Sequence, residues 1–156
     1  YIVFLLYPHH ENFNKRLIKS PKIYFHDTGL LCSLLGLRSA EQLATHYLRG
    51  GVFENYIIAE VFKKHVHSGR RPELYFWRDN TGNELDLLVE QGTRRQIIEI
   101  KSGATLSESQ FKGLKYYQKL TGGPRPEHEY YLVYGGDRDQ TRAYGHVLSW
   151  RKVDDL

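Results

Sequence analysis

The feature that most constrains this fold is a stretch of alternating apolar and charged residues at positions 83–101. Two such runs are separated by a short turn at Gln91-Gly92, which is typical of a β-hairpin. The second run is nearly continuously apolar around its charges and therefore favours a central strand buried on both faces. Residues two apart on a strand share a face, so Glu99 and Lys101 are predicted to lie side by side.

The first strand of this hairpin is predicted to have two distinct faces. Alternation gives one face with Leu85, Leu87 and Val89 and another with Glu84, Asp86 and Leu88. Pairing of the strands would bring Asp86 beside Glu99, where facing like charges repel unless a cation offsets them. A half-exposed hairpin with polar residues on its wet face is the alternative. The cost of burying unpaired charges in a central strand favours a site that holds a divalent metal.

Composition restricts the class of protein. The chain has 156 residues, of which 40% are hydrophobic and 26% charged, which indicates a globular chain of one domain or one domain and part of another. A net charge of +4 and a pI near 9.1 permit nucleic acid as a partner. The single cysteine, Cys32, excludes an internal disulfide framework and fits a reducing, cytoplasmic compartment.

The start of the chain and its missing motifs narrow the expectations further. The apolar opening at residues 1–7 is too short to span a membrane and lacks the features of a signal peptide. The chain has no methionine, and we interpret this opening as the end of a preceding element. No Gly-x-x-x-x-Gly-Lys-Ser/Thr stretch occurs, so no ATP site is expected within these residues.

Residues 1–50 are assigned to an N-terminal segment. It contains a basic stretch whose side chains could contact phosphates, although a solvated basic face is the alternative: Lys15, Arg16, Lys19 and Lys22. Two short helices are expected, one after the cap Asp27 and one after Ser39. The second is predicted to end at Gly50-Gly51.

Residues 51–156 are assigned to a second domain. A helix at 52–65, strands at 73–78 and in the hairpin, a helix at 107–120 and strands at 129–134 and 144–150 are expected. This order predicts an α/β (α+β) fold, a mixed central sheet flanked by helices. A strand that returns through a helix pairs in parallel by a right-handed crossover.

Two helices carry further candidates. Glu54 is predicted on the apolar side of the first helix, where a carboxylate needs a partner; a favourable charge near the helix N-terminus is the alternative. Ser107 and Gln110 have capping-box spacing at the start of the second helix. Lys112 and Lys115 fall on its exposed side.

Taken together, these residues resemble the PD-(D/E)XK nuclease signature: Glu54 on a helix, Glu84-Leu85-Asp86 on one strand and Glu99-Ile100-Lys101 on the next. More narrowly, the chain is similar to a domain of unknown function that follows a prokaryotic AAA-type ATPase. The stretches that carry this likeness are 20–30, 53–55, 75–79 and 83–101. The proline of the signature is absent, since Leu85 precedes Asp86.

The resemblance implies a fold and a chain organisation. The fold would be a restriction-endonuclease-like core with the order α-β-β-β-α-β. In that family an ATPase module and a winged-helix segment precede the domain, so residues 1–50 would include the end of the winged-helix or linker region.

The resemblance also implies roles for particular residues. Asp86 and Glu99, with the backbone carbonyl of Ile100, would hold Mg²⁺ or Mn²⁺, and Lys101 would orient the attacking water or stabilise the transition state. Glu54 would bind a second metal or a metal-bound water. The auxiliary residues would be Glu84, and Gln110 near the phosphate backbone, although capping explains Gln110 equally well.

Two classes of function follow. One is metal-dependent hydrolysis of DNA by a domain attached to an ATPase. The other is a catalytically silent domain that binds DNA or a protein and regulates the ATPase. Retention of Asp86, Glu99 and Lys101 together favours hydrolysis, because a silent domain has no chemical need for all three.

Overall fold

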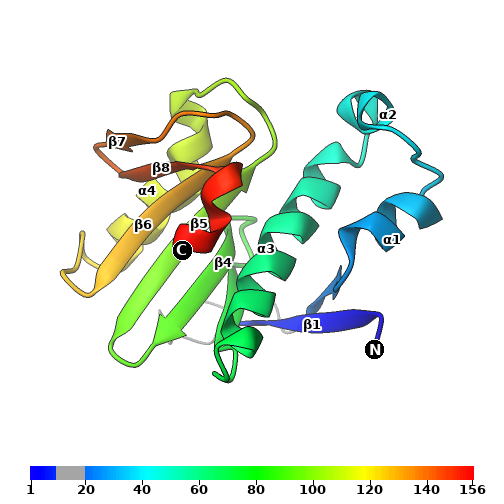
Figure 1. Ribbon diagram of the computed structural model, residues 1–156. Coiled ribbons are helices and arrows are strands. Elements are labelled where there is room, and N and C mark those ends of the chain that lie inside the picture. The colour runs from blue at the N-terminus through cyan, green and yellow to red at the C-terminus, as the bar shows by residue number, and fades with distance from the viewer. Residues whose placement is uncertain (10–19) are drawn as a thin grey trace.

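The computed structural model describes residues 1–9 and 20–156, and these residues form one mixed eight-stranded sheet (Figure 1). The strand order is β2-β1-β3-β4-β5-β6-β8-β7. The strands are β1 (Val3–Pro8), β2 (Lys22–Phe25), β3 (Leu74–Arg78), β4 (Glu84–Gln91), β5 (Arg94–Lys101), β6 (His128–Tyr134), β7 (Gln140–Arg142) and β8 (Gly145–Ser149). The predicted mixed sheet is therefore confirmed.

The centre of the sheet follows the predicted connections. Strands β3, β4 and β5 are consecutive and antiparallel, and β5 pairs in parallel with β6 across its whole length. The crossover between β5 and β6 contains the short helix η1 (Glu108–Phe111) and α4 (Lys112–Leu120). Elements α3, β3, β4, β5, α4 and β6 thus follow one another in the order expected from the sequence.

Helices cover both faces of the sheet (Figure 1). The long helix α3 (Arg49–His67) and the terminal turn η2 (Trp150–Asp155) pack on one face, where the buried side chains include Ile57, Ile58, Leu87 and Ile98. Helix α4 packs on the other, against a core centred on the fully buried Trp77. Helices α1 (Thr28–Leu34) and α2 (Ala40–Thr45) pack against α3.

The predicted faces of β4 are wrong at one position. Leu87 packs on the α3 side, but Leu85 packs on the α4 side together with Leu88. The cause is an irregularity in the pairing with β3, because Tyr75 lies opposite Leu88 and Trp77 lies opposite Leu85. Between these two pairs the chain advances two residues along β3 but three along β4, so β4 contains one extra residue, a β-bulge. Beyond the bulge the side chains of β4 point to the opposite faces from those that strict alternation predicts.

Two element boundaries and one strand also differ from expectation. Gly50-Gly51 does not end the second helix: α2 ends at Thr45, and both glycines lie within the first turn of α3. The hairpin turn is shifted by one residue, to positions 92 and 93, because Gln91 pairs with Arg94. Strand β7 was not predicted, since its three residues carry no apolar pattern.

The expected helix starts are confirmed by their caps. Asp27 accepts a hydrogen bond from the Leu30 amide, and Ser39 accepts one from the Gln42 amide. The side chains and backbones of Ser107 and Gln110 form the reciprocal capping box. Within residues 1–9 and 20–156, no helix is long and apolar enough to cross a membrane.

Candidate active site

Asp86 and Glu99 meet where β4 and β5 begin to separate. The antiparallel register pairs Leu87 with Ile98, so the next positions along the two strands are those of the carboxylates. Both side chains are buried, with Asp86 9% and Glu99 7% exposed. Two buried carboxylates thus occupy neighbouring positions on paired strands.

Lys101 lies between these two acids. Its Nζ is 2.6 Å from Oε1 of Glu99 and 3.7 Å from Oδ2 of Asp86. The same Oδ2 accepts a 2.7 Å hydrogen bond from the backbone N–H of Ile100. The bulge in β4 therefore aims Asp86 at the backbone of β5, where an ordinary ladder would place a main-chain carbonyl.

Burial and crowding shift the ionisation of all three groups. Burial raises the pKa of Asp86, and the charge of Glu54 raises it further, while Lys101 lowers it only in part. Burial also raises the pKa of Glu99, with Asp86 as the next cause. Burial lowers the pKa of Lys101, but Asp86 and Glu99 outweigh that effect, so the net shift is upward. The ammonium is thereby kept charged between two carboxyls that resist ionisation.

A glycine on α4 makes room for Glu99. A Cβ atom at Gly113 would lie 2.6 Å from Oε2 of Glu99 and 2.8 Å from the carbonyl oxygen of Glu84. Within the described residues, this Oε2 is buried and has no hydrogen-bond partner. Because buried polar atoms are nearly always paired, the unpaired oxygen indicates a place where a further group can bind.

A second charge cluster adjoins the first. Lys22 Nζ lies 3.1 Å from Oε1 of Glu54 and also forms an ion pair with Glu84. The hydroxyl of Tyr24 donates to Glu54, and Arg78 Nε is 3.4 Å from Oε2 of Glu84. Glu54 is therefore held by β2, and it acts on Asp86 through its charge.

Sequence reasoning missed how Lys22, Tyr24 and Arg78 are used. Lys22 was grouped with a basic stretch that could contact phosphates, but in the structure it binds two acids of the same chain. The available signal was the alternation in residues 22–25, which places Lys22 and Tyr24 on one face of a strand. Nothing in the sequence indicated that this strand would pack beside the N-terminal half of α3.

Two of the predicted metal ligands, Asp86 and Glu99, converge on Lys101, whereas Glu54 pairs with Lys22. Among the described residues, no group of three or more His, Cys, Asp or Glu side chains is placed to hold a metal ion. Asp86 and Glu99 share one cation, the Lys101 ammonium, and Mg²⁺ is often held by one or two carboxylates with waters and a phosphate. The Ile100 carbonyl faces the same side, since N–H and C=O of one strand residue point together.

The remaining predicted residues lie apart from these acids. Gln110 uses both ends of its side-chain amide in capping, to the Ser107 amide and the Thr105 carbonyl. Lys112 is exposed on α4, and Lys115 pairs with Glu108 at 3.0 Å. Lys15, Arg16 and Lys19, which are predicted to contact phosphates, lie outside the described residues.

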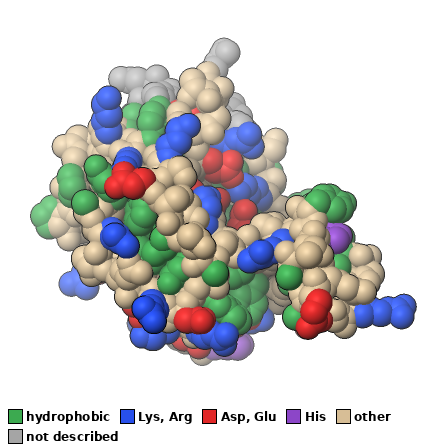
Figure 2. Space-filling model, turned by 90° about the horizontal axis from the view of Figure 1, so that it is seen from above, with side chains coloured by type: hydrophobic (Ala, Val, Ile, Leu, Met, Phe, Trp, Pro, Cys, Tyr) green, Lys and Arg blue, Asp and Glu red, His purple; other side chains and the backbone are tan. Residues whose placement is uncertain are grey.

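Figure 2 looks down on this end of the sheet. Acidic and basic side chains lie close together in the hollow between the main body and the projecting part of the molecule. This mixture agrees with the ion pairs described above, in which each of the four acids has a cationic neighbour: Glu54, Glu84, Asp86 and Glu99. The site is charged but largely compensated.

Comparison with known proteins places the chain in a family. Residues 49–153 match a family described as a domain of unknown function, DUF4143. The chain belongs to the DUF4143 family. Residues 1–41 match a second domain of unknown function, DUF8612. The DUF4143 match begins at the first residue of α3 and includes Asp86, Glu99 and Lys101.

Two curated mycobacterial proteins are similar to this DUF4143 chain. Both are uncharacterized proteins, one of Mycobacterium bovis and one of Mycobacterium tuberculosis. Each is 36% identical over 108 residues, which is 69% of this chain and 24% of the relative. The chain therefore spans about a quarter of the length of these relatives.

Proposed function

We propose that this DUF4143 domain hydrolyses phosphodiester bonds of DNA with the aid of Mg²⁺ or Mn²⁺. The observation that carries the proposal is the buried pair Asp86 and Glu99, held against Lys101, with Oε2 of Glu99 unpaired in the described part of the chain. Such a pair is costly for the fold, and a divalent cation would remove the cost. Perturbed ionisation at a charged site is typical of catalysis.

Each residue has a role that its position can support. Asp86, Glu99 and the Ile100 carbonyl would hold the metal, which when bound lowers the pKa of a water and neutralises charge on the phosphate. Lys101 keeps its proton, so its Nζ can donate hydrogen bonds to a phosphate oxygen or to the attacking water. Its present partners are the same carboxylates, so metal binding would release it for this task.

Glu54 and Glu84 would act at the edge of this site. Their shared partner Lys22 holds them in place, and the charge of Glu54 reaches Asp86. Weakening of the Lys22 pair would make Glu54 available for a second metal or a metal-bound water. Because the chain resembles domains that follow an ATPase, we further propose that an ATPase module in a longer protein directs the cleavage.

A silent domain that binds DNA or protein is the second candidate. The observation that favours it is the internal compensation of the acids, since Lys22 and Lys101 already neutralise much of the charge. A site that is satisfied by its own lysines can persist without metal or chemistry. In this case Asp86 and Lys101 would serve only to order the ends of β4 and β5.

Thermal melting with and without Mn²⁺ separates the two candidates. Mn²⁺ should raise the Tm of the wild type, more at pH 7.5 than at pH 5, because the ligands must be ionised. Asp86→Asn should remove the response, whereas Lys101→Ala should retain it and both should abolish plasmid cleavage. The control is Asp137→Asn, because Asp137 is an exposed acid that does not belong to the site. Equal responses in wild type and Asp86→Asn would establish the silent domain instead.

DNA binding has its own test. Lys112 and Lys115 on α4, with Lys15, Arg16 and Lys19, would contribute phosphate contacts that carry no sequence information. Binding of a fluorescent duplex should weaken steeply with salt, and Lys112→Ala with Lys115→Ala should reduce the slope of log K against log salt by about two. Binding that does not respond to salt would exclude this role for the lysines.

A further inference from the structure

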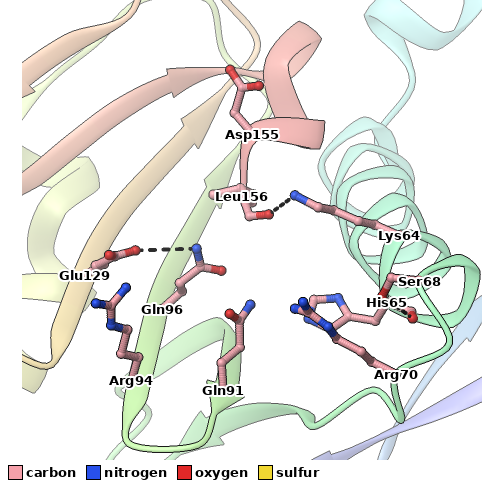
Figure 3. A pocket seen from close by; sticks show the side chains of 10 residues that line it. All are labelled: Lys64, His65, Ser68, Arg70, Gln91, Arg94, Gln96, Glu129, Asp155 and Leu156. Carbon is pink, nitrogen blue, oxygen red and sulfur yellow. Dashed lines mark hydrogen bonds between the residues drawn. The ribbon is translucent and has the colours of Figure 1, made fainter.

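A separate hollow of about 380 Å³ opens at the opposite end of the sheet (Figure 3). It lies between the end of α3, the turn joining β4 to β5, and the last residues of the chain. On α3, His65 at this hollow is 11 residues beyond Glu54, which is about 16 Å along the helix axis. Its size is within the range of pockets that hold small ligands.

Two buried acceptor atoms at this hollow have no partner among the described residues. His65 is 5% exposed, and its Nδ1 lies 2.9 Å from the carbonyl oxygen of Val61. A carbonyl only accepts, so Nδ1 carries a proton, and in that tautomer of a neutral imidazole Nε2 is an acceptor. Within the described residues this Nε2 is buried and has no partner. Gln96 donates through Nε2 to Glu129 at 3.5 Å, which leaves its buried Oε1 unpaired as well.

Two arginines at the same hollow have no acidic partner among the described residues. Arg70 follows the end of α3, and Arg94 begins β5. In Figure 3 the amides of Gln91 and Gln96 lie between Arg94 on one side and the Arg70 and His65 side chains on the other. Guanidinium groups match the oxygens of phosphates and carboxylates and bind them through paired hydrogen bonds.

Glu129 and Asp155 also line the hollow, and Lys64 donates to the carbonyl oxygen of Leu156. Among the described residues, Arg70 and Arg94 remain without acidic partners, and His65 Nε2 and Gln96 Oε1 remain without donors. A ligand that satisfied them would carry an anionic group for Arg70 and Arg94 and hydrogen-bond donors for His65 Nε2 and Gln96 Oε1. We propose that this hollow binds a phosphate monoester that also carries hydroxyl groups, of the size of a mononucleotide. A phosphate monoester supplies up to two negative charges and three acceptor oxygens, which suits two arginines better than a single carboxylate does.

This site is independent of the proposed hydrolysis. None of its residues belongs to the acid cluster, and the chemistry there would neither require nor exclude a ligand here. The monoester has two sources, a free mononucleotide or the phosphorylated end of a nucleic-acid strand, and the same chemistry recognises both. The relative affinities for a mononucleotide and for a 5′-phosphorylated oligonucleotide distinguish the two sources.

Isothermal titration calorimetry of the chain with adenosine 5′-monophosphate at fixed ionic strength tests the proposal. Adenosine 5′-monophosphate should bind, whereas adenosine and malonate should not. Arg70→Ala and Arg94→Ala should each weaken binding about tenfold, because each removes a charge-assisted contact. Arg38→Ala, at an exposed arginine outside this hollow, should bind as the wild type does.

The affinities for different ligands identify the source of the monoester and can contradict the proposal. Tighter binding of a 5′-phosphorylated oligonucleotide than of the mononucleotide assigns the hollow to a strand end, and the reverse assigns it to a free nucleotide. Absence of binding, binding of adenosine or malonate with equal affinity, or binding that both arginine variants retain would overturn the proposal. Arg70 and Arg94 are exposed and pair with no acid in residues 1–9 and 20–156. The variants should therefore fold, and a melting curve of each checks this.

Discussion

The charged side chains at the two ends of the central sheet differ in their burial and in their partners. At the end where β4 and β5 separate, Asp86, Glu99 and Lys101 are partners of one another and are mostly buried. At the end where the hairpin turns, Arg70 and Arg94 are exposed and, among the described residues, lack acidic partners. The contrast indicates that charge at the first end contributes to folding, whereas charge at the second is available to a ligand.

Removal of the ammonium that neutralises the two buried carboxylates should give the largest effect. Lys101→Met leaves two buried carboxylates without their cation and should lower the free energy of unfolding by about 2–3 kcal/mol at pH 7. The cost should shrink toward pH 4, because the raised pKa values of Asp86 and Glu99 keep both carboxyls protonated in the folded chain there. Urea denaturation at both pH values measures this. Lys63→Met, at the more exposed helical pair with Glu60, is the control and should cost little. An equal cost for Lys101→Met at both pH values would mean that packing, not charge, is responsible.

Filling the space beside Glu99 should give the next largest effect. A Cβ at Gly113 meets Glu99 and the Glu84 backbone, so Gly113→Ala should cost about 1–2 kcal/mol despite the better helix propensity of alanine. Gly51→Ala, in α3 with no atom within 4 Å of the added Cβ, should instead stabilise by up to about 1 kcal/mol. Denaturant midpoints of the two variants test the comparison, which fails if both shift in the same direction.

The pH dependence of stability should reveal the raised pKa of Glu99. The folded chain binds a proton at this carboxyl at pH values where the unfolded chain has lost it. The free energy of unfolding should therefore fall as pH rises from the ordinary glutamate pKa through the raised folded one. Glu99→Gln should make the free energy of unfolding less dependent on pH. Without metal, it should raise the free energy of unfolding by about 1 kcal/mol at pH 7.5. A steeper fall in the variant would contradict the direction of the shift.

Changes at the opposite end should have the smallest effect on stability. Arg70→Ala and Arg94→Ala remove exposed cations that pair with no acid in the described part of the chain, so the Tm without ligand should stay at the wild-type value. Differential scanning calorimetry in phosphate-free buffer checks this. A clear drop in Tm would show that these arginines hold the fold together and would remove the contrast between the two ends.

Much of the central sheet could be predicted from the sequence, because its signals are local. Alternation and capping residues located the hairpin, α4 and the order of the elements, although the hairpin turn lies one residue beyond its predicted position. The acids of the site were identified by type and spacing. The faces of β4 could not be predicted, since the bulge depends on how β3 pairs with it.

The partners of the acids could not be predicted either. Lys22 reaches Glu54 from 32 positions away, and Gly113 opposes Glu99 from another helix. Such contacts depend on how whole elements pack, and no local pattern encodes them. The hollow that holds Arg70 and Arg94 was missed for the same reason, because its residues come from α3, the loop after it, three strands of the sheet and the last residues of the chain.

The pairing of β1 with β3 has a consequence for the order of folding. Tyr7 pairs with Tyr75, a separation of 68 residues, and among the described strands β2 pairs with β1 alone. Pairings across such long stretches of chain close slowly, whereas the β4–β5 hairpin forms from neighbours. Because β2 carries Lys22 and Tyr24, the partners of Glu54 should arrive after the sheet centre has formed. Pulsed hydrogen exchange should show protection at Ile98 before Tyr24. During that interval Glu54 and Glu84 would lack their partner Lys22.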